Sequence, residues 1–128
     1  MQENHLFEYA IIRVVPRVER EEFLNVGVIL YCRQEQFLQT LFTLDEQRLF
    51  AFYPETDINE VQMHLNAFEQ ISLGNAEAGP IASLDIASRF RWLTAKRSTV
   101  LQTSGVHPGL CKDACETLIR LHKQLVLA

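Results

Sequence analysis

Two nearly uninterrupted apolar runs near the N-terminus constrain the fold more than any other feature of the chain. Residues 6–15 (LFEYAIIRVV) and 23–32 (FLNVGVILYC) are rich in β-branched and aromatic side chains, a pattern typical of strands covered on both faces. Pro16 ends the first run, and Gly27 within the second indicates a bulge or a close backbone approach. Period-two alternation predicts one shared face for five residues of the second run: Leu24, Val26, Val28, Leu30 and Cys32.

A hairpin and two helices are predicted next. Residues 33–36 are typical of a tight turn, and residues 37–44 of the returning strand. Residues 45–52 predict a short helix. In the longer helix that follows, Asp57 is the expected N-cap and Gly74 the expected stop. Its inward face repeats at helical spacing at Ile58, Val61, Leu65, Phe68 and Ser72.

The last third of the chain continues this alternation. Pro80 is expected in the first turn of a helix over residues 81–92. Residues 98–103 predict a fourth strand, which Gly105 and Pro108 end. A closing amphipathic helix is predicted from apolar residues at Ala114, Leu118, Leu121 and Leu125.

The order of these elements predicts the fold class. We expect a single α+β domain over residues 1–128, a length that suits one domain. It should contain a small antiparallel or mixed sheet of about four strands with three to four helices packed on it. Because the helices follow the first three strands, we expect them on one face of the sheet.

Charge is distributed unevenly along the chain. The net charge is −4. Residues 1–88 hold five basic and fourteen acidic side chains, a net charge of −9, whereas residues 89–128 hold seven and two, a net charge of +5. Overall acidity argues against non-specific coating of nucleic acid, which depends on neutralising phosphates. A local positive face remains compatible with the sequence.

Hydropathy and cysteine content predict a cytoplasmic protein. The longest apolar run, Val26–Cys32, has seven residues, whereas a membrane-spanning helix needs about 20. The first ten residues lack the basic and apolar regions of a signal peptide. Three cysteines, an odd number, do not suggest a disulfide framework.

A basic, aromatic segment is the strongest candidate for a binding site. Four cations, two aromatic rings and two hydroxyls fall close together: Arg89, Phe90, Arg91, Trp92, Lys96, Arg97, Ser98 and Thr99. Guanidinium groups bind phosphate bidentately, and an aromatic ring can stack on a base. The structural alternative, which we favour, is that the arginines balance helix dipoles or pair with acids while Phe90 and Trp92 fill the core.

Arg13 is unusual because it interrupts an apolar strand. A charge there must be paired, or must lie at a sheet edge or in a cleft. The favoured interpretation is a structural ion pair with a carboxylate such as Glu22. If Arg13 instead lies beside Arg89 or Arg97, these arginines would form a shared anion pocket. The acids of residues 19–22 alone are weak evidence for a divalent cation.

His107 lies in a Gly-Val-His-Pro-Gly segment where an exposed side chain is expected, so it is a candidate general base or phosphate donor. With Cys111, Cys115 and His122 it could in principle bind zinc. However, the spacing does not match the C-x₂₋₄-C knuckle of structural zinc sites. We therefore assign no metal site and no cofactor. The chain also lacks a glycine-rich phosphate loop and a complete catalytic set.

Two long segments resemble a known bacterial family. Residues 9–30 (YAIIRVVPRVEREEFLNVGVIL) and 89–110 (RFRWLTAKRSTVLQTSGVHPGL) are similar to domain of unknown function 3037, and the resemblance extends over nearly the whole chain. The family label implies no activity. Members of that family are often encoded beside kinases resembling the HipA toxin, so the resemblance implies a partner or regulator of another protein.

The leading hypothesis is therefore a protein-binding or regulatory accessory domain that acts with a HipA-like kinase. The alternative is a nucleic-acid or phosphate-ligand binding protein, nuclease-like in one version. Its candidate residues are Arg13, Arg89, Arg91, Trp92, Lys96, Arg97, Ser98 and His107. A homodimer is a third interpretation. We expect no membrane partner, and nucleic acid less than protein.

Overall fold

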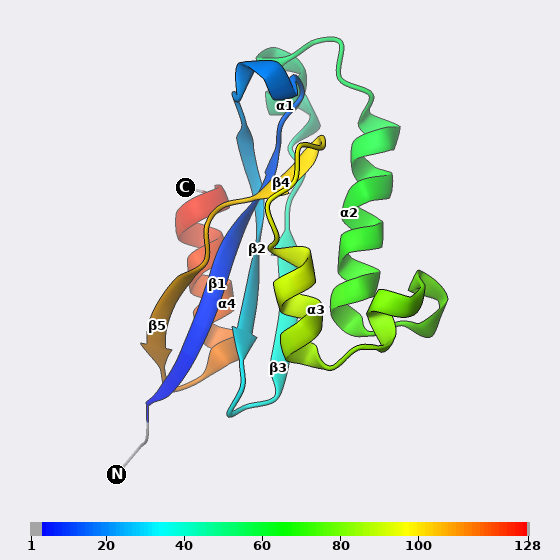
Figure 1. Cartoon of the computed structure of the whole chain (residues 1–128). Coiled ribbons are helices and arrows are strands. Elements are labelled where there is room, and N and C mark those ends of the chain that lie inside the picture. Colours follow the sequence, from blue (N-terminus) through cyan, green and yellow to red (C-terminus); the bar gives the residue numbers. More distant parts are fainter. Residues whose placement is uncertain (1–3, 128) are drawn as a thin grey trace.

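The N-terminal strand lies in the middle of a five-stranded antiparallel sheet (Figure 1). The computed structural model describes residues 4–127. On one side, β1 (His5–Val14) pairs with β2 (Leu24–Cys32), and β2 pairs with β3 (Phe37–Phe42). On the other side, two short strands pair with β1 one after the other: β5 (His107–Cys111) along its first half and β4 (Leu101–Thr103) along its end. The α+β fold class is confirmed.

β4 ends before Gly105 as predicted, but the chain then forms a further strand, β5, that contains Pro108 and was not predicted. Pro108 lies opposite Glu8 in a strand that pairs only with β1. Proline has no backbone N–H to donate, and it is tolerated at a sheet edge where that group would face solvent. The predicted strand over 98–103 is also shorter than expected, because only Leu101–Thr103 pairs with β1.

A bulge in β2 explains why one predicted strand face is wrong. Ile12 lies opposite Gly27, but Arg13 lies opposite Asn25, so Val26 is the extra residue. An extra residue reverses the alternation of faces beyond it. Leu24 and Val26 consequently face one core, and Val28, Leu30 and Cys32 face the other.

Gly27 also fulfils the expectation of a close backbone approach. A Cβ atom at Gly27 would lie 2.7 Å from both the Leu41 carbonyl oxygen and the Phe42 Cβ. Contacts that short do not occur between such atoms without movement. Only glycine therefore fits this position of β2 in the observed geometry.

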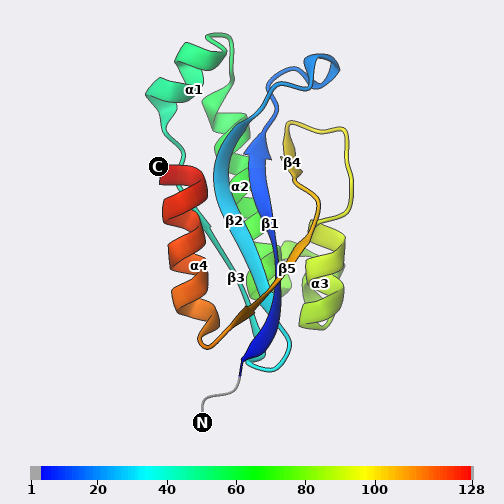
Figure 2. The ribbon, with the colours of Figure 1, turned by 90° about the vertical axis from the view of Figure 1, so that its left-hand side faces the viewer.

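Helices cover both faces of the sheet, which corrects the prediction of a single covered face (Figures 1 and 2). α2 (Ile58–Leu73) and α3 (Ile86–Leu93) pack on one side with β1, β2 and β3. α4 (Ala114–His122), continued by a π-helical turn over Lys123–Leu127, packs on the other side against β2 and β3. The central strands are apolar on both faces, so both faces require a cover.

Aspartate side chains define where the helices begin. Asp45 accepts the Arg48 N–H at the start of α1 (Glu46–Phe52), and Asp57 accepts the Glu60 N–H at the start of α2. Gly74 ends α2 in the left-handed conformation, with φ of 74°. These three boundaries are as predicted, because local capping chemistry decides them.

α3 begins later than the sequence predicts. Residues Pro80–Ser83 form a separate 3-10 turn, and Asp85 then adopts an extended conformation and accepts the Ser88 N–H at 2.7 Å. Asp85 is therefore the true N-cap, and the predicted helix over 81–92 is divided in two. None of the helices described between residues 4 and 127 combines the length and apolar character needed to cross a membrane.

Candidate anion-binding site

Arg91 is neutralised by an ion pair. Its two terminal nitrogens donate to the two carboxylate oxygens of Glu8 at 2.7 and 2.6 Å. This hydrogen bonding raises the pKa of Arg91 above its ordinary value. Arg91 therefore pairs with an acid, which is the structural role favoured from the sequence. A guanidinium held bidentately by one carboxylate offers few donors to a second anion.

Arg89 contacts backbone carbonyls rather than an acid, and its buried Nε, like that of Arg13, has no hydrogen-bond partner among the described residues. Its Nη1 donates to the Leu84 carbonyl oxygen at 2.5 Å, and its Nη2 lies 3.5 Å from that of Ser72, in the last turn of α2. A cation beside the C-terminal carbonyls of a helix is favoured by the helix dipole. Phe90, the next residue, is fully buried in the core. These residues of the basic segment therefore serve the fold.

Arg97 caps α3 and retains unused donors. Its guanidinium donates to the carbonyl oxygens of Trp92 and Leu93, the latter at 3.2 Å, and lies 4.1 Å from the centroid of the Trp92 ring. Burial lowers the pKa of Arg97. A guanidinium has five N–H groups, so this arrangement fixes its position and leaves N–H groups for another acceptor.

Arg13 lacks the ion pair that the sequence favoured. Glu22 pairs with Arg20 instead, and no ion pair found among residues 4–127 includes Arg13. The Arg13 guanidinium lies 3.8 Å from the centroid of the Phe23 ring. Its Nε is buried and has no hydrogen-bond partner among the described residues, and burial lowers the pKa of Arg13.

The two arginines line one pocket of ≈ 340 Å³, which we call the Arg13–Arg97 pocket. Arg13 and Gln102 lie opposite each other in the pairing of β1 with β4, so β4 contributes a neutral polar wall. The loop between α3 and β4 contributes further donors from Lys96, Arg97 and Ser98. The complete lining consists of Arg13, Val15, Val18, Glu21, Phe23, Lys96, Arg97, Ser98 and Gln102.

The chemistry of this pocket favours an anion. Three cationic side chains, one hydroxyl and one amide surround it, and Glu21 is the one carboxylate in its lining. Guanidinium groups positioned by aromatic rings are well suited to bind phosphate oxygens in pairs. Of the eight residues predicted for an anion site, the structure brings four together: Arg13, Lys96, Arg97 and Ser98.

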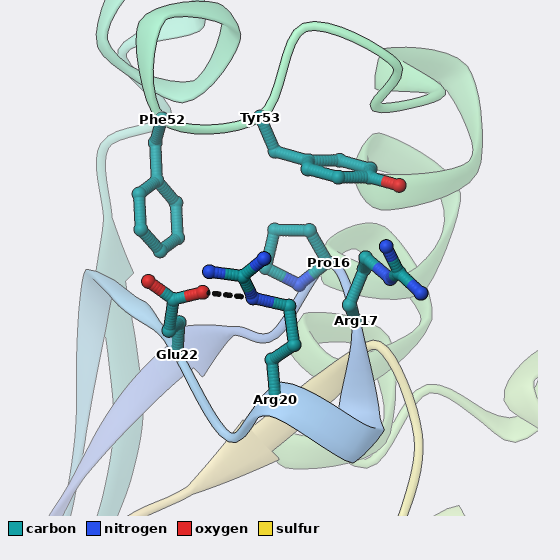
Figure 3. Close-up of a pocket in the computed structure, with 6 residues that line it drawn as sticks. All are labelled: Pro16, Arg17, Arg20, Glu22, Phe52 and Tyr53. Carbon is teal, nitrogen blue, oxygen red and sulfur yellow. Dashed lines mark hydrogen bonds and ion pairs between the residues drawn. The ribbon is translucent and has the colours of Figure 1, made fainter.

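A second pocket lies between the loop that joins β1 to β2 and the end of α1 (Figure 3). Its lining consists of Pro16, Arg17, Arg20, Glu22, Phe52 and Tyr53. Arg20 pairs with Glu22, and Arg17 pairs with Glu19 at 2.7 Å. Because both arginines are neutralised, this pocket has less attraction for an anion. Glu19 and Glu22 are held in these ion pairs, whereas Glu21 lines the Arg13–Arg97 pocket.

The remaining predicted residues lie outside the Arg13–Arg97 pocket. His107 is exposed on β5, with its ring 5.3 Å from that of Tyr9. Nε2 of His122 lies 3.0 Å from the hydroxyl of Thr43. His107, Cys111, Cys115 and His122 do not form a group with metal-ligand spacing within the described part of the chain.

Sequence reasoning missed Phe23, Glu21 and Gln102 as parts of the site. Phe23 is recognisable as an aromatic residue next to an apolar strand, but its contact with Arg13 depends on the turn between β1 and β2. Gln102 joins the pocket only through the antiparallel register of β4 with β1. No local pattern in the sequence encodes that register.

Comparison with known proteins identifies the family. The model of a family described as "Protein of unknown function (DUF3037)" matches residues 9–126, nearly the whole chain. The chain therefore belongs to this family, as the resemblance of its two long segments predicts. Neither the curated proteins nor the solved structures contain a match to it.

Proposed function

We propose that this member of the family binds a phosphate-bearing small ligand in the Arg13–Arg97 pocket. One observation carries the proposal. Two partly buried guanidinium groups line the same pocket, and neither forms an ion pair with any described residue. An unpaired cation withdrawn from water is costly, and a bound anion compensates for that cost.

The lowered pKa values of Arg13 and Arg97 support this interpretation. In both cases burial is the sole cause of the shift, so lost hydration is not balanced by a nearby negative charge. By contrast, the pKa of Arg91 is raised because Glu8 accepts its hydrogen bonds. A bound phosphate group would place a negative charge beside Arg13 and Arg97 and would raise their pKa values, as Glu8 does for Arg91.

The remaining basic residues favour a small ligand over a nucleic-acid strand. Arg91 is paired with Glu8, and Arg89 donates to backbone carbonyls away from the pocket lining, so neither adds a cation to the pocket. The Trp92 ring has a guanidinium over it at 4.1 Å, which occupies a face that a base would need. Strand binding requires several phosphate contacts along a groove, and this pocket provides room for one or two.

The lining favours binding over catalysis. Within the described chain, the pocket is lined by neither histidine nor cysteine. Among the described residues no hydrogen bond joins Ser98 to Glu21, the one carboxylate of the lining, and general-base activation of a hydroxyl requires such a contact. We therefore assign the pocket to ligand recognition, which agrees with an accessory or regulatory protein.

Isothermal titration calorimetry with inorganic phosphate, a nucleoside monophosphate and a single-stranded oligonucleotide tests the proposal. We expect saturable binding of one phosphate ligand per chain. Arg13→Gln should weaken it by at least about 10-fold, since a hydrogen bond to a charged group contributes about 1.5–3 kcal/mol. Glu21→Gln should tighten binding, because it removes the carboxylate from the lining.

Arg91→Gln is the matched control, because it removes one positive charge from the same basic segment but outside the pocket. It should leave phosphate binding unchanged. If Arg91→Gln and Arg13→Gln weakened phosphate binding equally, the loss would be explained by overall charge alone, and this would contradict the proposal. Absence of binding by the wild-type chain at millimolar phosphate would contradict it as well.

A second candidate function is binding of a protein partner, and one specific surface favours it. Leu6 and Leu110 lie directly opposite each other in the pairing of β1 with β5, and they are 58% and 66% exposed. Leu6 also lines a hollow with Glu8, Ala87 and Arg91. Adjacent exposed leucines on a sheet edge are typical of interaction surfaces. We propose this surface as the contact for the HipA-like kinase that the family resemblance implies.

Co-elution of the purified chain with that kinase tests the second candidate. A double substitution, Leu6→Ser with Leu110→Ser, should abolish co-elution, whereas Met63→Ser on α2, also 64% exposed, should not. Independent elution of the two wild-type proteins at micromolar concentration would contradict the proposal. If the chain alone sediments as a dimer and the double substitution makes it a monomer, the surface would be assigned to contact with a second copy of the chain instead.

A further inference from the structure

Four side chains with metal-binding atoms meet at one end of the molecule. His5 begins β1, Cys32 ends β2, Glu35 lies in the β2–β3 turn and Cys111 ends β5. Figures 1 and 2 show these segments together at the end of the sheet near the N-terminus, where α4 also begins. His5 and Cys111 lie opposite each other in the pairing of β1 with β5.

Glu35 is the centre of this group. Its Oε2 lies 3.1 Å from Nδ1 of His5, 3.9 Å from Sγ of Cys32 and 4.0 Å from Sγ of Cys111. The ligand atoms of His5, Cys32 and Glu35 lie within 4.8 Å of one another. Cys111 lies outside that set of three but adjoins it through Glu35. We call these four residues the His5–Cys111 cluster.

The separations of Glu35 Oε2 from the other three ligand atoms resemble edges of a tetrahedral zinc site. Zinc binds thiolate sulfur at about 2.3 Å and nitrogen or oxygen at about 2.0–2.1 Å, so neighbouring ligand atoms are about 3.3–3.8 Å apart. The separation of Oε2 from Nδ1 is slightly shorter than that range and its separations from the two sulfurs are slightly longer. We propose that the His5–Cys111 cluster is a zinc site in which Glu35, Cys32, His5 and Cys111 are the four ligands.

The ligand types select the metal. Thiolate and imidazole favour zinc, whereas magnesium and calcium require oxygen ligands. Cys32 is fully buried, and Cys111 is 6% exposed. Four protein ligands without an open position characterise a structural site rather than a catalytic one. Binding of zinc would displace one proton from each thiol, so two protons are released for each ion bound.

The start of α4 supplies a partner for the ligating carboxylate. The Ala114 N–H lies 3.0 Å from Oε2 and 3.3 Å from Oε1 of Glu35. When Oε2 binds the ion, Oε1 can keep the Ala114 hydrogen bond, and such contacts orient metal ligands. Two thiolates, one carboxylate and one divalent cation leave a net charge of −1, which the N-terminus of α4 stabilises.

This site would join segments that are distant in the sequence. Cys111 is 79 residues from Cys32, and the ion would connect β1, β2 and β5 beside the first turn of α4. A cross-link between such distant segments restricts the unfolded chain most. The inference is independent of the proposed phosphate pocket, which contains none of the four ligands.

Titration of the metal-free full chain with Co²⁺ and Zn²⁺, under argon with a non-thiol reductant, tests the proposal. We expect one Co²⁺ per chain with the visible absorption of tetrahedral cobalt and a thiolate charge-transfer band, both removed by one equivalent of Zn²⁺. Zinc should also raise the thermal unfolding midpoint by several degrees. Cys32→Ser and Glu35→Gln should each weaken binding by more than about 100-fold, since loss of an outer-shell partner alone costs about 10–100-fold.

Cys115→Ser is the matched control, because Cys115 is an exposed cysteine outside the cluster. It should bind Co²⁺ as the wild type does. If Cys32→Ser fails to fold by circular dichroism, the partly exposed Glu35→Gln and the wild-type spectrum still decide the question. Cobalt without a thiolate band, binding lost in Cys115→Ser, or no stoichiometric metal would overturn the proposal. A Cys32–Cys111 disulfide in air, with no metal bound after reduction, would overturn it and identify a redox pair.

Discussion

Substitution of Arg13 by methionine is expected to stabilise the ligand-free protein. Methionine keeps an unbranched apolar side chain at this position and removes a guanidinium that lies over the Phe23 ring and whose Nε is buried without a partner among the described residues. A binding site that holds a charge ready for its ligand is destabilising while it is empty. The proposed function therefore predicts a gain in stability where loss of an arginine would ordinarily have little benefit.

The magnitude follows from two opposing contributions. An unpaired buried donor costs about 1–3 kcal/mol, and the lost contact of the cation with the Phe23 ring contributes about 0.5–1 kcal/mol in the other direction. Because the Arg13 side chain is partly exposed, its cost lies in the lower half of that range. The net gain is about 1 kcal/mol, which corresponds to a rise of about 3–5 °C in the unfolding midpoint.

Urea unfolding of wild type, Arg13→Met and Arg97→Met, in buffers without phosphate, measures this effect. Arg97→Met removes the same charge from the same pocket, but it also loses the hydrogen bonds to the Trp92 and Leu93 carbonyls. It should therefore destabilise the chain by about 1 kcal/mol. Added phosphate should stabilise the wild type and not Arg13→Met. If Arg13→Met is less stable than the wild type, or if the two substitutions change the free energy of unfolding equally, the predicted cost of the empty pocket is wrong.

Three further predictions concern the fold. Gly27→Ala should destabilise the chain by about 1–3 kcal/mol in urea unfolding, because its Cβ would lie 2.7 Å from Leu41 and Phe42 atoms; an unchanged midpoint would contradict the bulge geometry. Asp57→Ala should cost about 1 kcal/mol through loss of the α2 cap, measured the same way with Asp45→Asn as a conservative comparison at the α1 cap. Burial lowers the pKa of His122, so the unfolded chain binds a proton there first and the free energy of unfolding should fall as pH is lowered through about 6.5. His122→Asn should reduce this fall. A flat stability profile of the wild type from pH 7.5 to about 5.5 would contradict the prediction.

Local chemistry explains which parts of the fold could be predicted from the sequence. Asp57 and Gly74 bound α2 as expected because capping depends on residues within one turn. The placement of α4 on the opposite face could not be predicted in this way. It follows from apolar residues on both faces of β2, where Val28 and Leu30 face the second core and Ile29 faces the first, and which helix covers which face depends on long-range packing.

In the candidate site too, local features could be predicted from the sequence and long-range contacts could not. The sequence indicated Arg13 and Arg97 as candidates for one pocket, since a charge within an apolar strand and a cluster of cations are visible locally. The sequence could not predict that Glu22 forms its ion pair with Arg20, or that β4 brings Gln102 opposite Arg13. The His5–Cys111 cluster was missed because its members are spread from residue 5 to residue 111, and strand register alone brings them together.

The most direct test of the central claim is an NMR titration of the arginine side-chain Nε–Hε resonances with inorganic phosphate. The Nε of Arg13 is buried and has no partner among the described residues, so its resonance reports a newly bound acceptor. We expect saturable shifts of the Arg13 and Arg97 resonances with the same midpoint, while that of Arg91, paired with Glu8, stays in place. Shifts of equal size at all exposed arginines, or none at Arg13, would contradict the account.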